Sequence, residues 1–386
     1  MARAGAERRA LAAGARRPMS RMRLLVRIPN WVGDVVMASA ALRTLRRRLP
    51  EAHITLWGKP ALLAILRDTP WYDEQLVWPE AGAIAAARAV RGRGYTHALL
   101  LTHSWSSAIA AWLGGIPQRI GHRNDGRELL LTRALPLERR GRIRPVSAVL
   151  AYLALCEAMG CRVERSDRAI ELPVTEQARA RTRAWDAERG LLEGPAPVVC
   201  NVGAGFGRAK QWPAERWAAL ADRLVAGGRR VVVYGGPKDR AAVEAVLAAS
   251  RAAARGAVVA GLGVPIGDLA AHMARAALAI TTDSGGRHFP VAVGTPTIVL
   301  MGPNHPELSE SPGNLEHYVV LLTRPPCWPC HLRECPIDHR CMREIETETV
   351  ARFAEGWLAG RRPFGHAAPW RTPPGREHRL FRGACT

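Results

Sequence analysis

The chain has 386 residues, which is too long for one ordinary hydrophobic core and suits two domains. Hydrophobic residues make up 48% of it, so a sizeable buried core is available. No run approaches the ~18 to 20 uninterrupted apolar residues of a membrane span, and the N-terminus lacks the apolar stretch of a secretory signal. We therefore expect a cytoplasmic protein.

The formal net charge is +21, and the two ends of the chain contribute much of it. Residues 1–22 and 361–386 are rich in arginine and are expected to form disordered basic tails. The positive charge that remains on the folded part favours an anionic partner. Composition leaves three classes of partner open, namely nucleic acid, a phosphorylated lipid surface and a nucleotide.

Apolar runs typical of strands alternate with amphipathic helical patterns along most of the chain. Strands are predicted at 23–28, 53–57, 75–78 and 97–102 and in PVVCNVG, RRVVVYGG, ALAITTD, TIVLMG and YVVLLT, and helices at 34–48, 104–114, 213–227 and 238–249. Continuous apolar strands imply parallel sheets with helices on both faces. The fold class is therefore α/β, with two doubly wound parallel sheets, in domains over 23–175 and 190–350.

Ligands of open α/β sheets bind outside the carboxyl ends of the strands, so the loops that follow strands are where chemistry is expected. The loop NVGAGFGRAKQWP, residues 201–213, follows the first strand of the second domain. Its glycines, Gly203 among them, let the backbone approach a ligand, and Lys210 adds a positive charge beside a helix start. This combination suits a diphosphate. A flexible turn with a solvated lysine is the alternative.

A second loop begins at Asp283, where a strand runs into Ser284, Gly285 and Gly286 and then into a short helix containing His288. Asp283 either caps this helix or accepts hydrogen bonds from the hydroxyl groups of a sugar. In the second case the glycine amides would donate to phosphate.

The third loop, RIPNWVGD, places Asp34 at the start of the helix expected over 34–48. A carboxylate at this position either stabilises the helix terminus or takes part in chemistry. Local sequence alone favours the helix terminus.

Taken together, these loops resemble glycosyltransferase family 9, the ADP-heptose:lipopolysaccharide heptosyltransferases, and in particular its heptosyltransferase II branch. The stretches that carry the resemblance are RIPNWVGDVVM, RIGHRNDGRELLLT, NVGAGFGRAKQWP, VVVYGGPKD, TTDSGGRHFPVAVGTPTIVLMGPNHP and CWPCHLRECPIDHRCM, in family order over roughly 23–350. The resemblance implies a GT-B fold, with an N-terminal Rossmann-like domain for the acceptor and a C-terminal one for the nucleotide sugar. It also implies transfer with inversion at the anomeric carbon.

The resemblance implies roles for individual residues as well. Such a transfer needs a base for the acceptor hydroxyl, and Asp34 matches the residue with that role. Lys210 would neutralise the diphosphate leaving group. The other donor-binding residues would be Gly203, Asp283, Ser284, Gly285, Gly286 and His288, and the acceptor-binding residues would be Asn30, Trp31 and Arg123.

The chain departs from the family pattern in two places. After the sequence Asp-Ser-Gly it has Gly286 and Arg287, where the family usually has proline and an aliphatic residue. Arg287 either adds a phosphate contact or alters the donor pocket. Pro145 stands where the family usually has histidine. A donor other than ADP-heptose is therefore the alternative within the same reaction class.

No D-x-D motif occurs in the sequence, so a metal-bridged diphosphate is not expected. Lys210 and the amides of a helix start would replace the cation, and catalysis would require no cofactor.

Four of the eight cysteines cluster near the end of the second domain with the spacing C-x2-C-x4-C-x5-C: Cys327, Cys330, Cys335 and Cys341. His331 and His339 lie among them. In a cytosolic chain this pattern favours a structural Zn²⁺ site over disulfides. A redox-labile pair and a simple loop motif are the alternatives.

Three classes of function compete. The first is a monomeric glycosyltransferase at the cytoplasmic face of the inner membrane, acting on an anionic glycolipid that the basic surface holds. The second is a nucleotide-sugar epimerase or a phosphorylase, which would need other acid and base residues. The third is a nucleic-acid-binding protein, which the 6% aromatic content and the lack of a helix-turn-helix or RNP-like motif disfavour. No nucleic-acid partner is expected.

Overall fold

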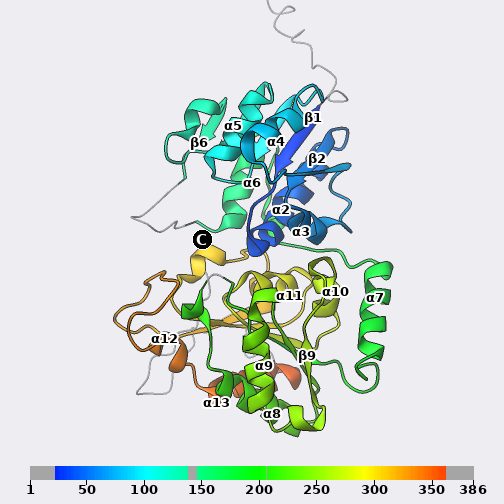
Figure 1. The fold of residues 1–386 in the computed structure, drawn as a ribbon, viewed down its shortest axis with the longest axis vertical. Coiled ribbons are helices and arrows are strands. Elements are labelled where there is room, and N and C mark those ends of the chain that lie inside the picture. The colour runs from blue at the N-terminus through cyan, green and yellow to red at the C-terminus, as the bar shows by residue number, and fades with distance from the viewer. Residues whose placement is uncertain (1–21, 138–145, 206, 362–386) are drawn as a thin grey trace, which may run out of the picture.

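The computed structural model describes residues 22–137, 146–205 and 207–361 (Figure 1). The two expected basic tails lie almost entirely outside these ranges, and so does Pro145. The described chain forms two α/β halves, one above the other in Figure 1, with the N-terminal half in blue to cyan at the top.

The N-terminal half is built on a sheet of six parallel strands. The strands are β1 (Arg23–Arg27), β2 (His53–Gly58), β3 (Glu74–Val77), β4 (His97–Leu100), β5 (Gln118–His122) and β6 (Arg133–Leu135). The main helices are α2 (Val32–Arg48), α3 (Pro60–Leu63), α4 (Gly82–Val90), α5 (Trp105–Leu113) and α6 (Ala148–Ala158). Successive side chains of a strand point to opposite faces, and on β1 Leu24 packs with α2 and α6 while Leu25 packs with α4 and α5.

The C-terminal half repeats this plan. Its strands are β7 (Val198–Asn201), β8 (Val231–Tyr234), β9 (Val258–Gly261), β10 (Leu278–Thr282), β11 (Thr297–Met301) and β12 (Tyr318–Leu322). Its helices are α8 (Ala214–Ala226), α9 (Arg240–Ala249), α10 (Leu269–Ala274), α11 (His288–Ala292), α12 (Arg340–Arg343) and α13 (Thr347–Leu358). On β7, Val198 and Val199 again belong to different core clusters on the two faces of the sheet.

Both sheets have the same strand order. They run β3-β2-β1-β4-β5-β6 and β12-β11-β10-β7-β8-β9, so the first strand of each half lies between its second and fourth strands. This is the order of dinucleotide-binding doubly wound sheets, in which ligands bind at the crevice beside the first strand. The prediction of two doubly wound parallel sheets is confirmed.

Three of the described strands, β5, β6 and β9, were not predicted from the sequence. β5 carries Gln118, Arg119 and His122, so it lacks a continuous apolar run, and β6 has only three residues. β6 and β9 lie at the edges of their sheets, where one side of the strand has no neighbour and a shorter, less apolar strand is tolerated.

The two halves share a hydrophobic core. One cluster of buried residues runs from β1 and α2 in the first half to Phe289 and Val291 of α11 in the second. The segment after α6 also bridges the halves, because Leu172 N donates to Ala292 O at 3.1 Å and Ile170 N donates to Asn314 Oδ1 at 2.8 Å. The linking helix α7 (Glu176–Ala187) packs on α10.

A cluster of ion pairs joins the two halves beside α7. Asp268 is buried and pairs with Arg67 of the first half and with Arg181 of α7, whose Nη2 lies 2.7 Å from Asp268 Oδ1. A buried carboxylate needs such compensation, so the two arginines help to fix the halves relative to each other.

His272 makes the core of the second half sensitive to acid. Its Nδ1 lies 2.8 Å from Tyr234 Oη, and the Trp185 ring packs against it edge-on at 5.0 Å. Burial, and then the charge of Arg275, lowers the pKa of His272 from 6.5 to about 4. The unfolded chain binds this proton more readily than the folded protein does. The contribution of the neutral His272 to the free energy of unfolding is therefore fully present above about pH 6.5. It is lost as the pH falls toward 4, which lowers the free energy of unfolding by up to roughly 3 kcal/mol.

We expect His272→Gln, which keeps a polar group beside Tyr234 but cannot titrate, to weaken this acid dependence. Urea unfolding at about pH 7.5 and 4.5 measures it in both proteins. The free energy of unfolding of the variant should change less between the two pH values. An equal change in both proteins would show that other groups carry the acid dependence.

Candidate active site

The two halves meet where α2 follows β1 and where the turn Gly285–Arg287 (η9) leads from β10 into α11 (Figure 1). Two glycines permit this approach. A Cβ on Gly33 would lie 2.9 Å from Gly285 Cα, and a Cβ on Gly285 would lie 2.8 Å from Gly33 N. Two loops far apart in sequence are thus held together at the carboxyl ends of both central strands, where ligands of such sheets bind.

Asp34 is the third residue of α2, so it is a first-turn acid and not the N-cap. The N-cap is Trp31, whose side chain makes no capping hydrogen bond. The Asp34 carboxylate is half-buried, and Tyr152 Oη donates to its Oδ1 at 3.4 Å. Sequence reasoning missed Tyr152, because this contact joins positions 118 residues apart and no local pattern marks it.

The residues expected to bind the acceptor lie on the same edge of the first sheet. Trp31 is 55% exposed next to the junction of the two halves. Asn30 is exposed, and its Oδ1 accepts a hydrogen bond of 2.7 Å from the buried Arg27. Arg123 directly follows β5 and is exposed. All three residues therefore lie at the carboxyl-end edge of the first sheet, with exposed side chains that are not part of the hydrophobic core.

Lys210 and Asp283 form a buried ion pair. Lys210 Nζ donates to Asp283 Oδ2 at 2.8 Å and to the Asp283 carbonyl oxygen at 2.7 Å. Lys210 is only 7% exposed, so the alternative of a solvated lysine in a flexible turn is wrong. The 201–213 loop and the 283–288 loop, on neighbouring strands β7 and β10, are therefore joined through these two side chains.

Asp283 is the centre of a wider group, here called the Asp283 cluster: Lys210, Asp283, Arg287, Asn304 and Ser309. Asn304 Nδ2 donates to Oδ2 at 3.0 Å, Ser309 Oγ donates to Oδ1 at 3.2 Å, and Arg287 Nε lies 3.7 Å from Oδ1. The carboxylate thus bonds to side chains, and the helix-capping alternative is wrong. Sequence reasoning missed Asn304 and Ser309, although the GPNHP stretch on the same rim was a signal.

The charges of the cluster determine its protonation. Burial of Asp283 opposes ionisation, but the positive charges of Lys210 and then Arg287 outweigh it and hold the pKa of this carboxyl well below its usual range. Within this cluster two cations face one carboxylate, and the charge of Arg287 also acts on the nearby Glu310. Two buried cations on loops at the carboxyl ends of the strands suit an anionic ligand.

His288 lies beside this cluster in its neutral form. Burial, and then the charge of Arg287, moves the pKa of His288 well below its usual value. Its Cδ2 would be 3.0 Å from a Cβ on Gly33, which places the ring at the junction of the halves. Its Nδ1 has no hydrogen-bond partner among the described residues. Ser284, half-buried, occupies the N-cap position of η9 without a side-chain capping bond.

Gly203 and Gly286 are required by packing within the protein. A Cβ on Gly286 would lie 2.0 Å from Asn201 Nδ2, and a Cβ on Gly203 would lie 2.7 Å from Asp239 Oδ2. Packing within the protein therefore explains why both positions are glycine, independently of the expected approach of a ligand to their amides.

The four clustered cysteines do not form the expected zinc site. Within the described ranges, no three His, Cys, Asp or Glu side chains are arranged to hold a metal ion. Burial, followed by the neighbouring thiols, raises the pKa of Cys341 to about 12, so this thiol is protonated at neutral pH. Cys327 is exposed, whereas Cys330 and Cys335 are half-buried.

Contacts with the loop around Ala209 hold this cysteine segment in place. Ala209 N donates to Arg333 O at 2.9 Å, and His339 Nε2 lies 2.7 Å from Ala209 O. A Cβ on Gly207 would lie 2.3 Å from Arg333 O. The segment thus packs on the loop that carries Lys210, and the alternative of a loop motif fits better than zinc.

Two doubly wound parallel domains that meet at the carboxyl ends of their central strands form the GT-B fold, which glycosyltransferases share with nucleotide-sugar epimerases and phosphorylases, so the fold alone leaves the reaction open. Residues 83–340 match the family described as Glycosyltransferase family 9 (heptosyltransferase), and the chain belongs to this family. It is a glycosyltransferase.

Known relatives agree with this assignment. Lipopolysaccharide heptosyltransferase 2 of Escherichia coli (strain K12) is 29% identical over 315 residues, which are 78% of this chain and 89% of that protein. Lipooligosaccharide heptosyltransferase 2 of Haemophilus influenzae is 28% identical over 302 residues, 74% and 85% of the two chains. The solved structure of E. coli ADP-heptose lps heptosyltransferase II matches with a TM-score of 0.73 and 26% identity, covering 88% of this chain and 99% of that one.

Proposed function

We propose that this protein transfers a heptose from ADP-heptose to the inner core of a lipopolysaccharide or related glycolipid, with inversion at the anomeric carbon. The names of the relatives support the donor and the acceptor class. The observation that carries the proposal is the position of the Asp283 cluster. Its central residue, Asp283, lies two positions before Gly285, and Gly285 packs against Gly33, the residue that precedes Asp34.

In the proposed reaction Asp34 accepts the proton of the acceptor hydroxyl, and the hydroxyl oxygen forms a bond to the anomeric carbon. The bond from that carbon to the β-phosphate oxygen breaks, and its electron pair leaves with ADP. Lys210 and the amides of residues 284–286 stabilise the charge that develops on the diphosphate, so the proposal needs no metal ion or other cofactor.

The remaining assignments follow the same division of the chain. Residues 23–175 bind the acceptor, with Asn30, Trp31 and Arg123 at the rim. Residues 190–350 bind the donor, with Gly203, Ser284, Gly285, Gly286 and His288 around the diphosphate and sugar. The protein works as a monomer and has no nucleic-acid partner.

The test is incubation of the protein with ADP-heptose and a deacylated inner-core acceptor, followed by mass spectrometry of the acceptor. We expect a gain of one heptose. Parallel reactions with UDP- and GDP-sugars address the alternative donor. Transfer from one of these, with none from ADP-heptose, would overturn the donor assignment and leave the fold and reaction class intact.

We also propose that the enzyme works while bound at the inner-membrane surface. In the part of the chain that the structure describes, no helix has both the length and the apolar character needed to cross a bilayer. Instead, Trp105, Trp112 and Leu113 of α5 and Leu129 of the adjacent turn are exposed apolar residues. Trp105 and Trp112, two helical turns apart, share one face of α5. Exposed tryptophan and leucine side chains suit the interfacial region of a bilayer.

We expect the double variant Trp112→Ser, Leu129→Ser to bind vesicles of phosphatidylethanolamine and phosphatidylglycerol roughly tenfold more weakly, since each side chain removes part of the apolar area that would enter the interface. Co-sedimentation at physiological salt measures this. Leu192→Ser is the matched control, because Leu192 is exposed in the connector between the domains. Equal binding of all three proteins would assign membrane attachment to charge alone.

A further inference from the structure

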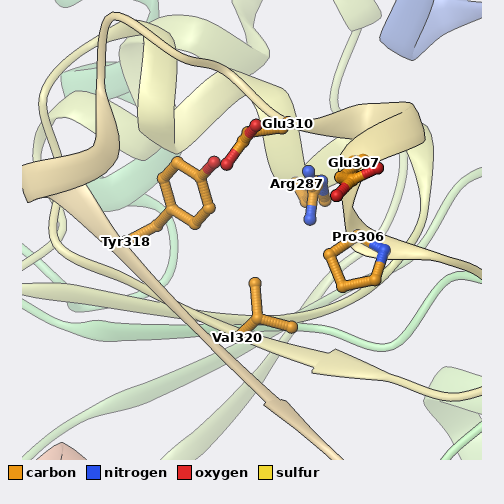
Figure 2. Close-up of a pocket in the computed structure, with 6 residues that line it drawn as sticks. All are labelled: Arg287, Pro306, Glu307, Glu310, Tyr318 and Val320. Carbon is orange, nitrogen blue, oxygen red and sulfur yellow. The ribbon is translucent and has the colours of Figure 1, made fainter. Parts of the chain in front are cut away.

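Arg287 is one of the residues at which the chain departs from the family pattern, and it is almost completely buried. It is 3% exposed at the end of η9. Its Nη2 donates to the Ser309 carbonyl oxygen, and its guanidinium lies 5.7 Å from the centre of the Tyr318 ring. Figure 2 shows it in a small pocket with Pro306, Glu307, Glu310, Tyr318 and Val320.

Arg287 contacts the oxygen of Asp283 that Lys210 leaves free. Lys210 Nζ and Asn304 Nδ2 bind Oδ2, whereas Ser309 Oγ binds Oδ1 and Arg287 Nε lies 3.7 Å from it. The carboxylate is therefore held between two cations, one on each side. Glu307 and Glu310 line the same pocket; within the described residues neither lies within ion-pair distance of Arg287, although the charge of Arg287 favours ionisation of Glu310.

The two cations differ in what else they can reach. Lys210 lies on the glycine-containing loop 201–213, next to the expected diphosphate, and its flexible side chain presents a point charge. Arg287 is fixed by its bond to Ser309 and by Tyr318, and its Nη1 has no partner among the described residues. An anion at the 201–213 loop would therefore compete with Asp283 for Lys210, while the bond to Ser309 holds Arg287 in place.

We propose that Arg287 is a positioning residue that keeps Asp283 compensated while Lys210 turns from that carboxylate to the donor diphosphate. Without Arg287, the move of Lys210 would leave a buried carboxylate without a counter-charge, which is strongly unfavourable. Arg287 thus lowers the cost of freeing Lys210. The inference rests on the proposed donor site.

The proposal makes a specific claim about coupling. If Arg287 acts through the charge of Asp283, its removal should matter only while Asp283 is charged. A residue that contacted the diphosphate directly would matter in either case. A double-mutant cycle between the two positions separates these possibilities.

The experiment measures ADP and adenosine binding by calorimetry for Arg287→Met, Arg287→Lys, Asp283→Asn and the double variant Asp283→Asn, Arg287→Met. Arg287→Met should weaken ADP binding roughly tenfold, the lower end of a charge-assisted interaction, and leave adenosine binding unchanged. Arg287→Lys should restore most of the loss. In the Asp283→Asn background, Arg287→Met should change ADP affinity by less than about twofold.

Three results would overturn the proposal: an equal loss for ADP and adenosine, a loss that persists in the Asp283→Asn background, or no loss at all. If Arg287→Met does not fold, Arg287→Lys and the comparison of Asp283→Asn with the double variant still decide it. Lys210→Met identifies the origin of a failure. Unchanged ADP affinity in Lys210→Met would remove Lys210 from the proposed donor site, whereas weakened affinity there with none of the Arg287 effects would refute only this inference.

Discussion

Replacing Asp34 with asparagine should lower the rate of sugar transfer by ~10² to 10⁴ while leaving the protein folded. Asparagine has nearly the same size but cannot accept the hydroxyl proton. The structural cost is small because Asp34 is not the N-cap of α2, and a first-turn acid contributes only about 0.3 to 1 kcal/mol through the helix dipole. The expected result is a near-normal melting curve with a large kinetic defect.

The measurement is single-turnover transfer with saturating donor, next to a melting curve of the same preparation. Tyr152→Phe is the matched control, since it removes the hydroxyl 3.4 Å from Asp34 Oδ1 and keeps the carboxylate. This control should retain far more activity than Asp34→Asn. If Asp34→Asn transfers sugar within a few-fold of the parent, the base lies elsewhere and the residue only stabilises the start of α2.

The architecture was predictable because it depends on local patterns. Parallel strands covered on both faces are continuous apolar runs, so β1, β7 and β11 stand out as RLLVRI, PVVCNVG and TIVLMG. The amphipathic patterns at 34–48 and 213–227 likewise match α2 and α8 closely. Only strands that the pattern does not mark, such as β6 with three residues, were missed.

The partners of the site residues were not predictable, because they depend on how distant segments meet. The sequence marked Lys210 and Asp283 as separate loop residues, and the structure joins them over 73 positions. Nothing local shows that Gly33 must lack a side chain so that Gly285 can approach it. The sequence left Arg287 as either a phosphate contact or a change to the donor pocket, and its burial against Ser309 and Tyr318 depends on segments distant in sequence.

For the cysteines, in contrast, a local pattern predicted a zinc site that the described residues do not form. Closely spaced cysteines fit both a zinc site and a tight loop, because spacing limits distance without fixing the direction of each side chain. The direction here is decided by contacts with the 207–210 loop, including the bond from Ala209 N to Arg333 O. Those contacts lie more than a hundred residues apart in sequence.

Lys210→Met should produce the second large effect, and it tests the donor side of the site. Loss of one charge-assisted contact weakens ADP binding by roughly 1.5 to 3 kcal/mol. The effect on kcat/KM should be larger, about 10² to 10³, because the lysine acts most strongly on charge that develops in the transition state. Asp283 keeps Arg287, Asn304 and Ser309 as neighbours, so the variant should fold.

The control for Lys210→Met is Lys238→Met. Lys238 is exposed after β8, at the same edge of the second sheet, so its removal changes the net charge equally without touching the Asp283 cluster. Calorimetry with ADP and initial rates with ADP-heptose should separate the two variants clearly. If both bind ADP within about twofold of the parent, the buried pair of Lys210 with Asp283 is purely structural, and the diphosphate must be neutralised by the loop amides and other cations.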